Sequence, residues 1–457
     1  MSDFDAIVIG AGPAGTTAAL VMARGGMKVA LIERGPYPGS KNLMGGVLYT
    51  DVLARIVPDF AEKGAPLERR ISEKRWSLLS TETSLSLSFR DFNWDKPPYN
   101  HSHTVLRARF DRWYAKIAEA EGVTLITGVV ADATLKDDEG TVIGVRTRVG
   151  EGTDAKEGDL FAPVVICAEG ANALIAEKEG MKPVLTVGDA AIAAKEVIKL
   201  PSSVVEDRFA LTDAQGAAYE FIGEATAGLP GAGFIYTNKD SLSVGIVAFP
   251  GDLAAAGLSP YELLDRFKAN PAVAPLVRGG ELVEYGAHLL PETGFDRMPL
   301  AVKDGFMLVG DAAGLVSTSP KHEGSNYAMA SGEMAGLAAL EARATGDYTV
   351  AGLSGYKRRM AESFVVKNME HYRAWPGFIR KHRHIFSDWP LAFGKIAEAA
   401  FRVGGEDGNL ENELFDLFQR RVGILPFAMT AVELRNALRI LGYGKTDKLL
   451  EYVARNW

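Results

Sequence analysis

Three glycines and one glutamate near the start of the chain have the spacing of a phosphate-binding loop. Gly10, Gly12 and Gly15 follow one apolar run, and Glu33 ends a second. The first glycine permits a tight turn, the second lets the backbone approach a diphosphate, and the third lets a helix lie close to the sheet. The helix N-terminus attracts an anion, and an acid about 20 residues later can accept ribose hydroxyls. The spacing therefore predicts that residues 4–35 bind a dinucleotide.

Two further glycine–acid pairs follow predicted strands. They are Glu169-Gly170 and Gly310-Asp311. A carboxylate at a strand end can accept hydrogen bonds from the ribityl hydroxyls of a flavin, while the next backbone amides face a phosphate. Either pair alone could be an ordinary strand-to-helix turn. Their order behind the first glycine loop indicates a flavin dinucleotide.

The composition limits the class of protein. The chain has 457 residues, too many for one ordinary domain, and its net charge of −8 argues against a nucleic-acid partner. No apolar run reaches the roughly 18–20 residues that a membrane span needs. The first predicted strand begins at once, so no signal peptide is expected before it. We expect a cytoplasmic protein, with contact at the cytoplasmic membrane face as one option.

The single cysteine excludes several kinds of site. Cys167 is the only one in the chain. A disulfide framework, a Cys-ligated zinc site and an iron–sulfur cluster, which needs about four thiolates, are therefore excluded. Cys167 lies in an apolar run that predicts a buried strand, so we expect it to pack in the core. No metal site is expected.

The order of motifs resembles the FAD-binding domain of the glutathione-reductase-like superfamily, in its hydroxylase and geranylgeranyl reductase type. Arg107 begins a segment, Arg-Ala-Arg-Phe-Asp, that is similar to the Arg-x-x-Phe-Asp helix start of that group. The resemblance implies that Arg107 reaches the FAD diphosphate or the flavin edge. A surface arginine that helps to open a helix is the alternative.

Further segments narrow the resemblance to FixC-type flavoproteins and electron-transfer-flavoprotein:quinone oxidoreductases. They lie at 39–49, 233–245, 279–288 and 322–332. Glu169 stands where the group usually has Asp. The resemblance implies one non-covalent FAD. The residues expected to bind it are Gly10, Gly12, Pro13, Ala14, Gly15, Glu33, Arg34, Lys41, Asn42, Gly45, Gly46, Arg107, Val130, Glu169, Gly170, Gly310, Asp311, Gly324, Ser325 and Asn326.

No nucleophile and base stand out in the sequence. If electrons pass through FAD, the cofactor carries the chemistry and no catalytic side chain is required. His322 and Glu323 are candidates for an acid–base pair near the flavin. Ser325 or Asn326 is expected to cap a helix that begins near Tyr327.

The predicted fold is α/β, in three parts. A Rossmann-like FAD-binding domain is assembled from 1–75, 104–185 and 296–350. Residues 76–103 and 186–295 carry short, evenly spaced strands with turn signals between them, which predict an inserted antiparallel sheet domain. Residues 351–457 are predicted to be helical.

The resemblance implies electron transfer from reduced electron-transfer flavoprotein to quinone, as the flavoprotein subunit of a Fix/Etf-type complex. Since no cluster fits in this chain, it also implies a separate ferredoxin-like iron–sulfur subunit beside the electron-transfer flavoprotein α and β subunits. The alternatives are a geranylgeranyl-type prenyl reductase and a non-catalytic assembly subunit with structural FAD. Aromatic and basic residues alternate from Tyr372 to Phe401. This stretch is a candidate for a partner surface or a membrane surface, and a helical core with a solvated basic face is the alternative.

Overall fold

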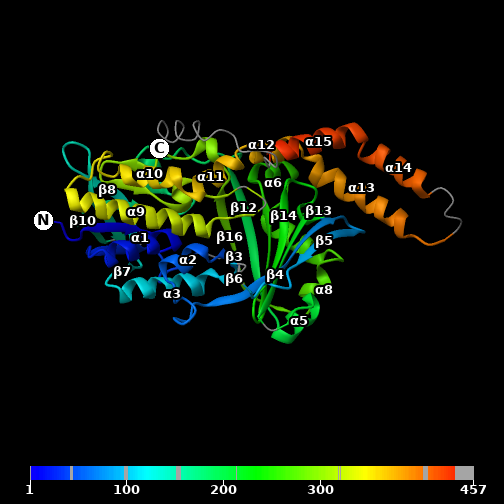
Figure 1. The fold of residues 1–457 in the computed structure, drawn as a ribbon, viewed down its shortest axis with the longest axis horizontal. Helices are drawn as coiled ribbons and strands as arrows, with labels where there is room; N and C mark the ends of the chain where they lie inside the picture. Colours follow the sequence, from blue (N-terminus) through cyan, green and yellow to red (C-terminus); the bar gives the residue numbers. More distant parts are fainter. Residues whose placement is uncertain are drawn as a thin grey trace.

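The fold is known from a computed structural model of elongated shape, with one sheet toward one end, a larger sheet near the middle and C-terminal helices at the other end (Figure 1). It describes residues 2–41, 45–96, 101–150, 156–212, 214–317, 319, 321–404 and 410–437. Asn42, one of the residues expected to bind FAD, lies outside this set.

The first sheet has six strands and is almost entirely parallel. Its order is β17 (Val302–Lys303), β18 (Phe306–Leu308), β11 (Val165–Cys167), β1 (Ala6–Ile9), β2 (Val29–Glu33) and β7 (Thr124–Thr127). Only the pair β17–β18 is antiparallel. The residues of β1, β2, β11 and β18 are all buried, as continuous apolar runs in a parallel sheet require. Cys167 is buried in β11, so its predicted place in the core is confirmed.

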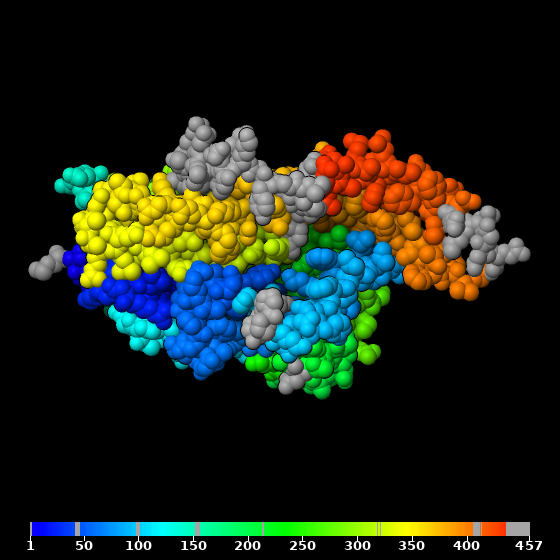
Figure 2. All heavy atoms as spheres, viewed as in Figure 1, coloured from blue at the N-terminus to red at the C-terminus, as the bar shows by residue number. Residues whose placement is uncertain are grey.

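Helices α1 (Pro13–Arg24) and α9 (Ser325–Thr345) pack closely over this sheet. A Cβ on Gly332 of α9 would lie 2.1 Å from the carbonyl oxygen of Ala14, so the close approach of the two helices requires glycine there. In the space-filling view, α9 and the segment that follows it (yellow) lie along the N-terminal segment that contains β1, α1 and β2 (blue) (Figure 2). Smaller elements complete this part: α2 (Asp51–Ile56), α3 (Arg107–Ala120), α4 (Leu174–Lys178), η3 (Phe295–Arg297), η4 (Gly310–Ala313), α10 (Ser354–Glu362) and α11 (Phe364–His371).

A three-stranded antiparallel sheet lies beside the parallel one. It consists of β8 (Val130–Lys136), β9 (Val142–Val149) and β10 (Lys156–Phe161). Glu179, after α4, joins it to β17 through ion pairs of 2.9 Å to both Lys136 and Lys303. Burial raises the pKa of Glu179, but hydrogen bonds from Thr134 and the two lysines outweigh it and lower that pKa to about 2.

The largest sheet has nine strands and is mixed. They are β3 (Gly45–Tyr49), β4 (Leu67–Leu79), β5 (Ser84–Arg90), β6 (Ser102–Leu106), β12 (Ala190–Lys199), β13 (Gln215–Gly223), β14 (Gly231–Thr237), β15 (Ser241–Ala248) and β16 (Glu281–Pro291). The sheet is not purely antiparallel as predicted, because β13 pairs with β4 in parallel. These two strands are joined by a long crossover rather than a hairpin, which permits parallel pairing. β3 and the first part of β4 each pair with β6 in this sheet. They therefore lie in the large sheet, although residues 1–75 are predicted to belong to the FAD-binding domain.

The two faces of the nine-stranded sheet have different coverings. One face packs against a second core that includes Tyr219, Ile235, Val244 and Phe267. Helices α5 (Ser202–Phe209), α6 (Pro250–Ala256), α7 (Pro260–Ala269) and α8 (Ala274–Val277) and the short η2 (Glu224–Thr226) belong to that side. The opposite face is directed toward the FAD-binding part.

The C-terminal region is helical, as predicted, over α12 (Trp375–Lys381), α13 (His384–Phe401), α14 (Leu410–Arg421) and α15 (Ile424–Ala437). α13 lies along β4, β5 and β13, and α13 and α14 extend beyond the sheet (Figure 1). No helix among the described residues is long and apolar enough to cross a membrane.

The aromatic and basic stretch is partly an internal surface. Phe378 and Phe386 are buried. Lys381 pairs with Glu433 of α15 at 2.7 Å, and Arg383 pairs with Asp252 of α6 at 2.9 Å. Lys381 and Arg383 are therefore engaged within this chain, with α15 and α6, respectively.

Candidate functional site

The three glycine motifs meet at one edge of the parallel sheet. β1, β11 and β18 are neighbours and run in the same direction, so their carboxyl ends lie together. The backbone amide of Ala168 donates to the carbonyl of Ile9 at 2.8 Å, and that of Val309 to the carbonyl of Cys167 at 3.1 Å. Residues far apart in the sequence thus line a single binding edge.

The first glycine loop has the geometry that its spacing predicts. Gly10 has φ +99°, and a Cβ there would lie 2.4 Å from the carbonyl oxygen of Ala168. A Cβ on Gly15 would lie 2.0 Å from the carbonyl oxygen of Gly10. Gly12 differs, because no atom lies within 4 Å of the position of its Cβ. α1 begins after Gly12 without any side-chain cap, and Pro13 has no N–H to donate, so the backbone N–H groups of Ala14 and Gly15 in its first turn are free to receive an anion.

Glu33 lies beside this loop at the end of β2. Its carboxylate accepts the backbone N–H of Ala11 at 3.1 Å and that of Gly35 at 2.7 Å. Burial raises its pKa, and the two backbone hydrogen bonds oppose that rise. The hydroxyl of Ser40 is also buried here, with no hydrogen-bond partner among the described residues. A carboxylate with spare acceptor capacity, an unpartnered hydroxyl and open space beside Gly12 fit the ribose and diphosphate of FAD.

The structure gives less for the remaining predicted residues, and their contact with FAD stays a prediction. The backbone N–H of Val129, next to Val130, donates to the carbonyl of Glu33 at 3.1 Å. Arg34 and Lys41 are exposed, and Gly45 and Gly46 lie in β3.

The second motif is held by its own acid. Glu169 accepts the backbone N–H of Ile175 at 3.0 Å and contacts the Cys167 sulfur at 3.3 Å. Gly170 has φ +76° and is followed by the left-handed Ala173 at the start of α4. Glu169 thus closes the turn, and FAD contact by Glu169 and Gly170 stays a prediction.

Arg107 is held in one orientation by Asp111. Two hydrogen bonds, Nε to Oδ1 at 2.7 Å and a terminal nitrogen to Oδ2 at 2.8 Å, join the two side chains one turn apart on α3. Both residues are buried. The charge of Asp311 acts on Arg107, which places the pair near the end of β18. Contact between this fixed, buried guanidinium and FAD stays a prediction.

The third motif is fixed from α9. The amide of Gly310 donates to the hydroxyl of Ser331 at 2.9 Å. Burial raises the pKa of the Asp311 carboxyl, while His288 and Arg107 lower it.

The expected cap and acid–base pair are corrected by the structure. α9 begins at Ser325, its N-cap is Gly324, and neither Ser325 nor Asn326 caps it. Asn326 donates to Glu323 at 2.9 Å instead. His322 is exposed, with φ +50°, and lies 3.8 Å from Glu220 rather than beside Glu323. His322 and Glu323 therefore point to different partners and form no acid–base pair.

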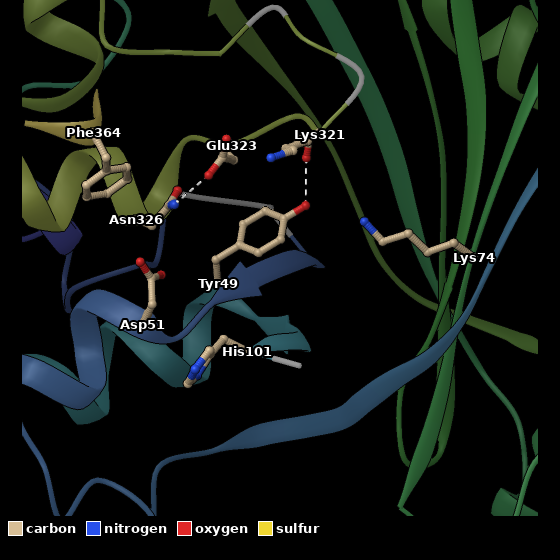
Figure 3. A pocket seen from close by; sticks show the side chains of 8 residues that line it. All are labelled: Tyr49, Asp51, Lys74, His101, Lys321, Glu323, Asn326 and Phe364. Carbon is tan, nitrogen blue, oxygen red and sulfur yellow. Dashed lines mark hydrogen bonds between the residues drawn. The ribbon is translucent and has the colours of Figure 1, made fainter. Parts of the chain in front are cut away.

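A cavity of about 330 Å³ lies between the start of α9 and the large sheet (Figure 3). Its lining residues are Tyr49, Asp51, Lys74, His101, Lys321, Glu323, Asn326 and Phe364. The Tyr49 hydroxyl donates to the carbonyl of Lys321 at 2.7 Å, and Lys74 projects toward it from β4. The amide oxygen of Asn326 is buried and has no hydrogen-bond partner among the described residues. The cavity can therefore receive a ligand with a donor group.

Sequence reasoning missed the residues that the large sheet supplies. Tyr236 of β14 is buried, the charge of Glu220 acts on it, and the ring of Phe234 stacks on its ring with 4.8 Å between the centroids. Lys195 and His288 lie on the neighbouring strands β12 and β16. The sequence does not indicate that these two residues share a face, because only strand pairing shows it.

Comparison with known proteins agrees with this geometry. A family described as FAD-dependent oxidoreductases matches residues 5–176. The FixC protein of Bradyrhizobium diazoefficiens is 39% identical over 407 residues, which cover 88% of this chain and 91% of the relative. The probable electron transfer flavoprotein-quinone oxidoreductase YdiS of Escherichia coli is 39% identical over 443 residues, covering 96% of this chain and 100% of the relative.

Solved structures show the same fold at lower identity. A geranylgeranyl bacteriochlorophyll reductase-like protein from Thermoplasma acidophilum aligns with a TM-score of 0.71 and 20% identity, over 95% of this chain and 99% of that one. The myxobacterial halogenase CndH aligns with a TM-score of 0.60 and 19% identity, over 97% of this chain and 98% of that one. These likenesses concern the fold alone.

Proposed function

Because this chain belongs to the family that includes FixC proteins and electron transfer flavoprotein-quinone oxidoreductases, we propose that it passes electrons from reduced electron-transfer flavoprotein to quinone. It is a FAD-dependent oxidoreductase of the electron-transfer type. The observation that carries the finer proposal is the cavity at the start of α9, whose lining includes Asn326, one of the residues expected to bind FAD. Bound FAD supplies the redox chemistry, accepting an electron pair and releasing it to an acceptor.

The side chains of this edge would hold the cofactor in place. Glu33 would accept the ribose hydroxyls, and the first turn of α1 would receive the diphosphate. Asp311 would accept hydrogen bonds from the ribityl hydroxyls, and Arg107, fixed by Asp111, would face the diphosphate or the flavin edge.

The arrangement of His322 and Glu323 supports electron transfer over acid–base catalysis. His322 lies near Glu220, whereas the Glu323 carboxylate accepts hydrogen bonds from Asn326 and Tyr327. A general base must lie within hydrogen-bond reach of the proton that it takes, together with a group that orients it. These two residues do not provide that arrangement.

We propose that the electron path continues on a second protein. The chain has one cysteine, whereas an iron–sulfur cluster uses about four thiolates. The expected partners are the electron-transfer flavoprotein α and β subunits and a small ferredoxin-like subunit. A tagged chain purified from native extract should bring these proteins with it, and purification of the chain alone would contradict this part of the proposal.

The exposed apolar residues suggest where the protein meets a quinone-bearing lipid surface. On β5, Leu87 and Phe89 are 67% and 69% exposed, and Phe401 at the end of the nearby α13 is 83% exposed. Contiguous exposed apolar residues often mark an interaction site. The double variant Leu87→Ser and Phe89→Ser should float less with quinone-containing vesicles than the control Leu282→Ser, an exposed leucine of β16. Equal flotation of both variants would contradict this surface.

A further inference from the structure

Lys195 lies on the face of β12 that is directed toward the FAD-binding part. Its neighbours in sequence, Ala194 and Glu196, lie on the other face: Ala194 belongs to the second core, and Glu196 pairs with Lys268 of α7 at 2.8 Å. Successive side chains of a strand point to opposite faces, so Lys195 projects away from α7. It is only 4% exposed.

The groups around Lys195 come from three elements. On β16, His288 pairs with Ala193 and Glu284 with Val197, so both lie on the same face as Lys195. On β15 the residue opposite is Gly245, where a Cβ would lie 2.3 Å from the ring of Phe234. From the FAD-binding part, the positive charge of Arg107 on α3 acts on Lys195.

These groups connect Lys195 to the cofactor edge. The charge of Arg107 acts on both Lys195 and Asp311, and His288 interacts with Asp311, Arg107, Arg34 and Lys195. Burial lowers the pKa of Lys195 to about 7, with Glu284 opposing and Arg107 adding to that change. The ammonium charge of Lys195 is therefore partly lost around neutral pH.

We propose that Lys195 reaches the cofactor site from the large sheet and that its positive charge favours reduced FAD over oxidised FAD. Uptake of two electrons and one proton leaves one additional negative charge on the cofactor, which a nearby ammonium group stabilises. Lys195 forms and breaks no bond in this step. The inference rests on FAD binding, and it does not depend on which proteins donate and accept the electrons.

The test is the midpoint potential of the FAD-bound, full-length protein, measured by spectroelectrochemistry. It is measured at about pH 6 and at about pH 8.5, which lie below and above the pKa of Lys195. The variants are Lys195→Met, which removes the charge, and Lys195→Arg, which keeps it at both pH values. Lys199→Met is the matched control, since Lys199 lies at the exposed end of the same strand.

At about pH 6, Lys195→Met should prefer reduced FAD about tenfold less than the unsubstituted protein, a potential about 30 mV lower for a two-electron couple. The difference should shrink at about pH 8.5, where Lys195 itself is largely neutral. The potential of Lys195→Arg should exceed that of Lys195→Met at both pH values. The potential of Lys199→Met should equal that of the unsubstituted protein at both.

An unchanged potential in Lys195→Met, or a decrease of equal size at both pH values, would overturn the proposal. If Lys195→Met does not retain FAD, Lys195→Arg decides the matter. An arginine variant with the same pH dependence as the unsubstituted protein would show that another group titrates.

Discussion

Replacing Gly12 by alanine should weaken FAD binding without weakening the fold. Gly12 has φ −77° and ψ −179°, which any residue can adopt, and no atom lies within 4 Å of the position of its Cβ. Lower chain entropy in the unfolded state favours alanine by about 0.4–1 kcal/mol, and the poorer N-cap costs a similar amount. The free energy of unfolding without FAD should therefore change by less than about 0.5 kcal/mol.

The new methyl group would instead occupy the space through which the diphosphate approaches the loop. Loss of one hydrogen bond to a charged group costs about 1.5–3 kcal/mol. The dissociation constant of FAD should accordingly rise about ten- to a hundredfold. The assays are titration of apoprotein with FAD, followed by flavin fluorescence, and thermal unfolding of the apoprotein.

Gly15→Ala is the matched contrast. Its Cβ would lie 2.0 Å from the carbonyl oxygen of Gly10, so α1 must move from the sheet, and the apoprotein should lose about 1–3 kcal/mol of stability. The reasoning fails if Gly12→Ala binds FAD as tightly as the unsubstituted protein. It also fails if the two variants destabilise the apoprotein equally.

Three further outcomes are expected. Asp111→Asn removes the negative charge that neutralises the buried Arg107 and should cost about 3–5 kcal/mol of stability. FAD should therefore raise the melting temperature more in this variant than in the unsubstituted protein, and an equal rise would contradict a role of Arg107 toward the anionic cofactor. Glu179 has a folded-state pKa of about 2, below its ordinary value, so it stabilises the fold above about pH 4.5 and this contribution is lost as pH falls toward 2. Glu179→Gln should therefore cost about 1–2 kcal/mol at neutral pH and much less at acidic pH in denaturant titrations, whereas a pH-independent cost would argue against the ion pairs. Gly245→Ala should lose about 1–3 kcal/mol by the same assay, because its Cβ would lie 2.3 Å from the Phe234 ring and 2.8 Å from the carbonyl oxygen of Ala194, and an unchanged midpoint would contradict this close packing.

The parallel sheet could be predicted because its signals are local. The run that became β1 is continuously apolar, and the run that became β2 is apolar up to Glu33. The glycines before α1 and in its first turn have a spacing that few other structures require. The resemblance to a known family predicted that the distant Gly310-Asp311 pair lies at the same edge of the parallel sheet as the first glycine loop. Each of these inferences needs only neighbouring residues or a fixed motif order.

Features that depend on pairing could not be predicted in this way. The parallel partnership of β13 with β4 joins segments more than a hundred residues apart, and nothing in either strand specifies the other. Lys195 was missed because one lysine in an apolar strand carries no sign of its face until β12 is paired with β16. The predicted cap of α9 was wrong, because the Asn326 side chain donates to Glu323 and accepts no backbone N–H of the first turn. Tertiary packing sets this arrangement.

The measurement that tests the central claim most directly is anaerobic mixing of the purified FAD-bound chain with reduced electron-transfer flavoprotein and then with quinone, followed by flavin absorbance. We predict that the flavin is reduced in the first step. In the second step, we predict that quinone reoxidises the flavin rapidly only when the small ferredoxin-like subunit is added. A flavin that stays oxidised in the first step would contradict the proposed function, and rapid quinone reduction by the chain without that subunit would contradict the separate cluster.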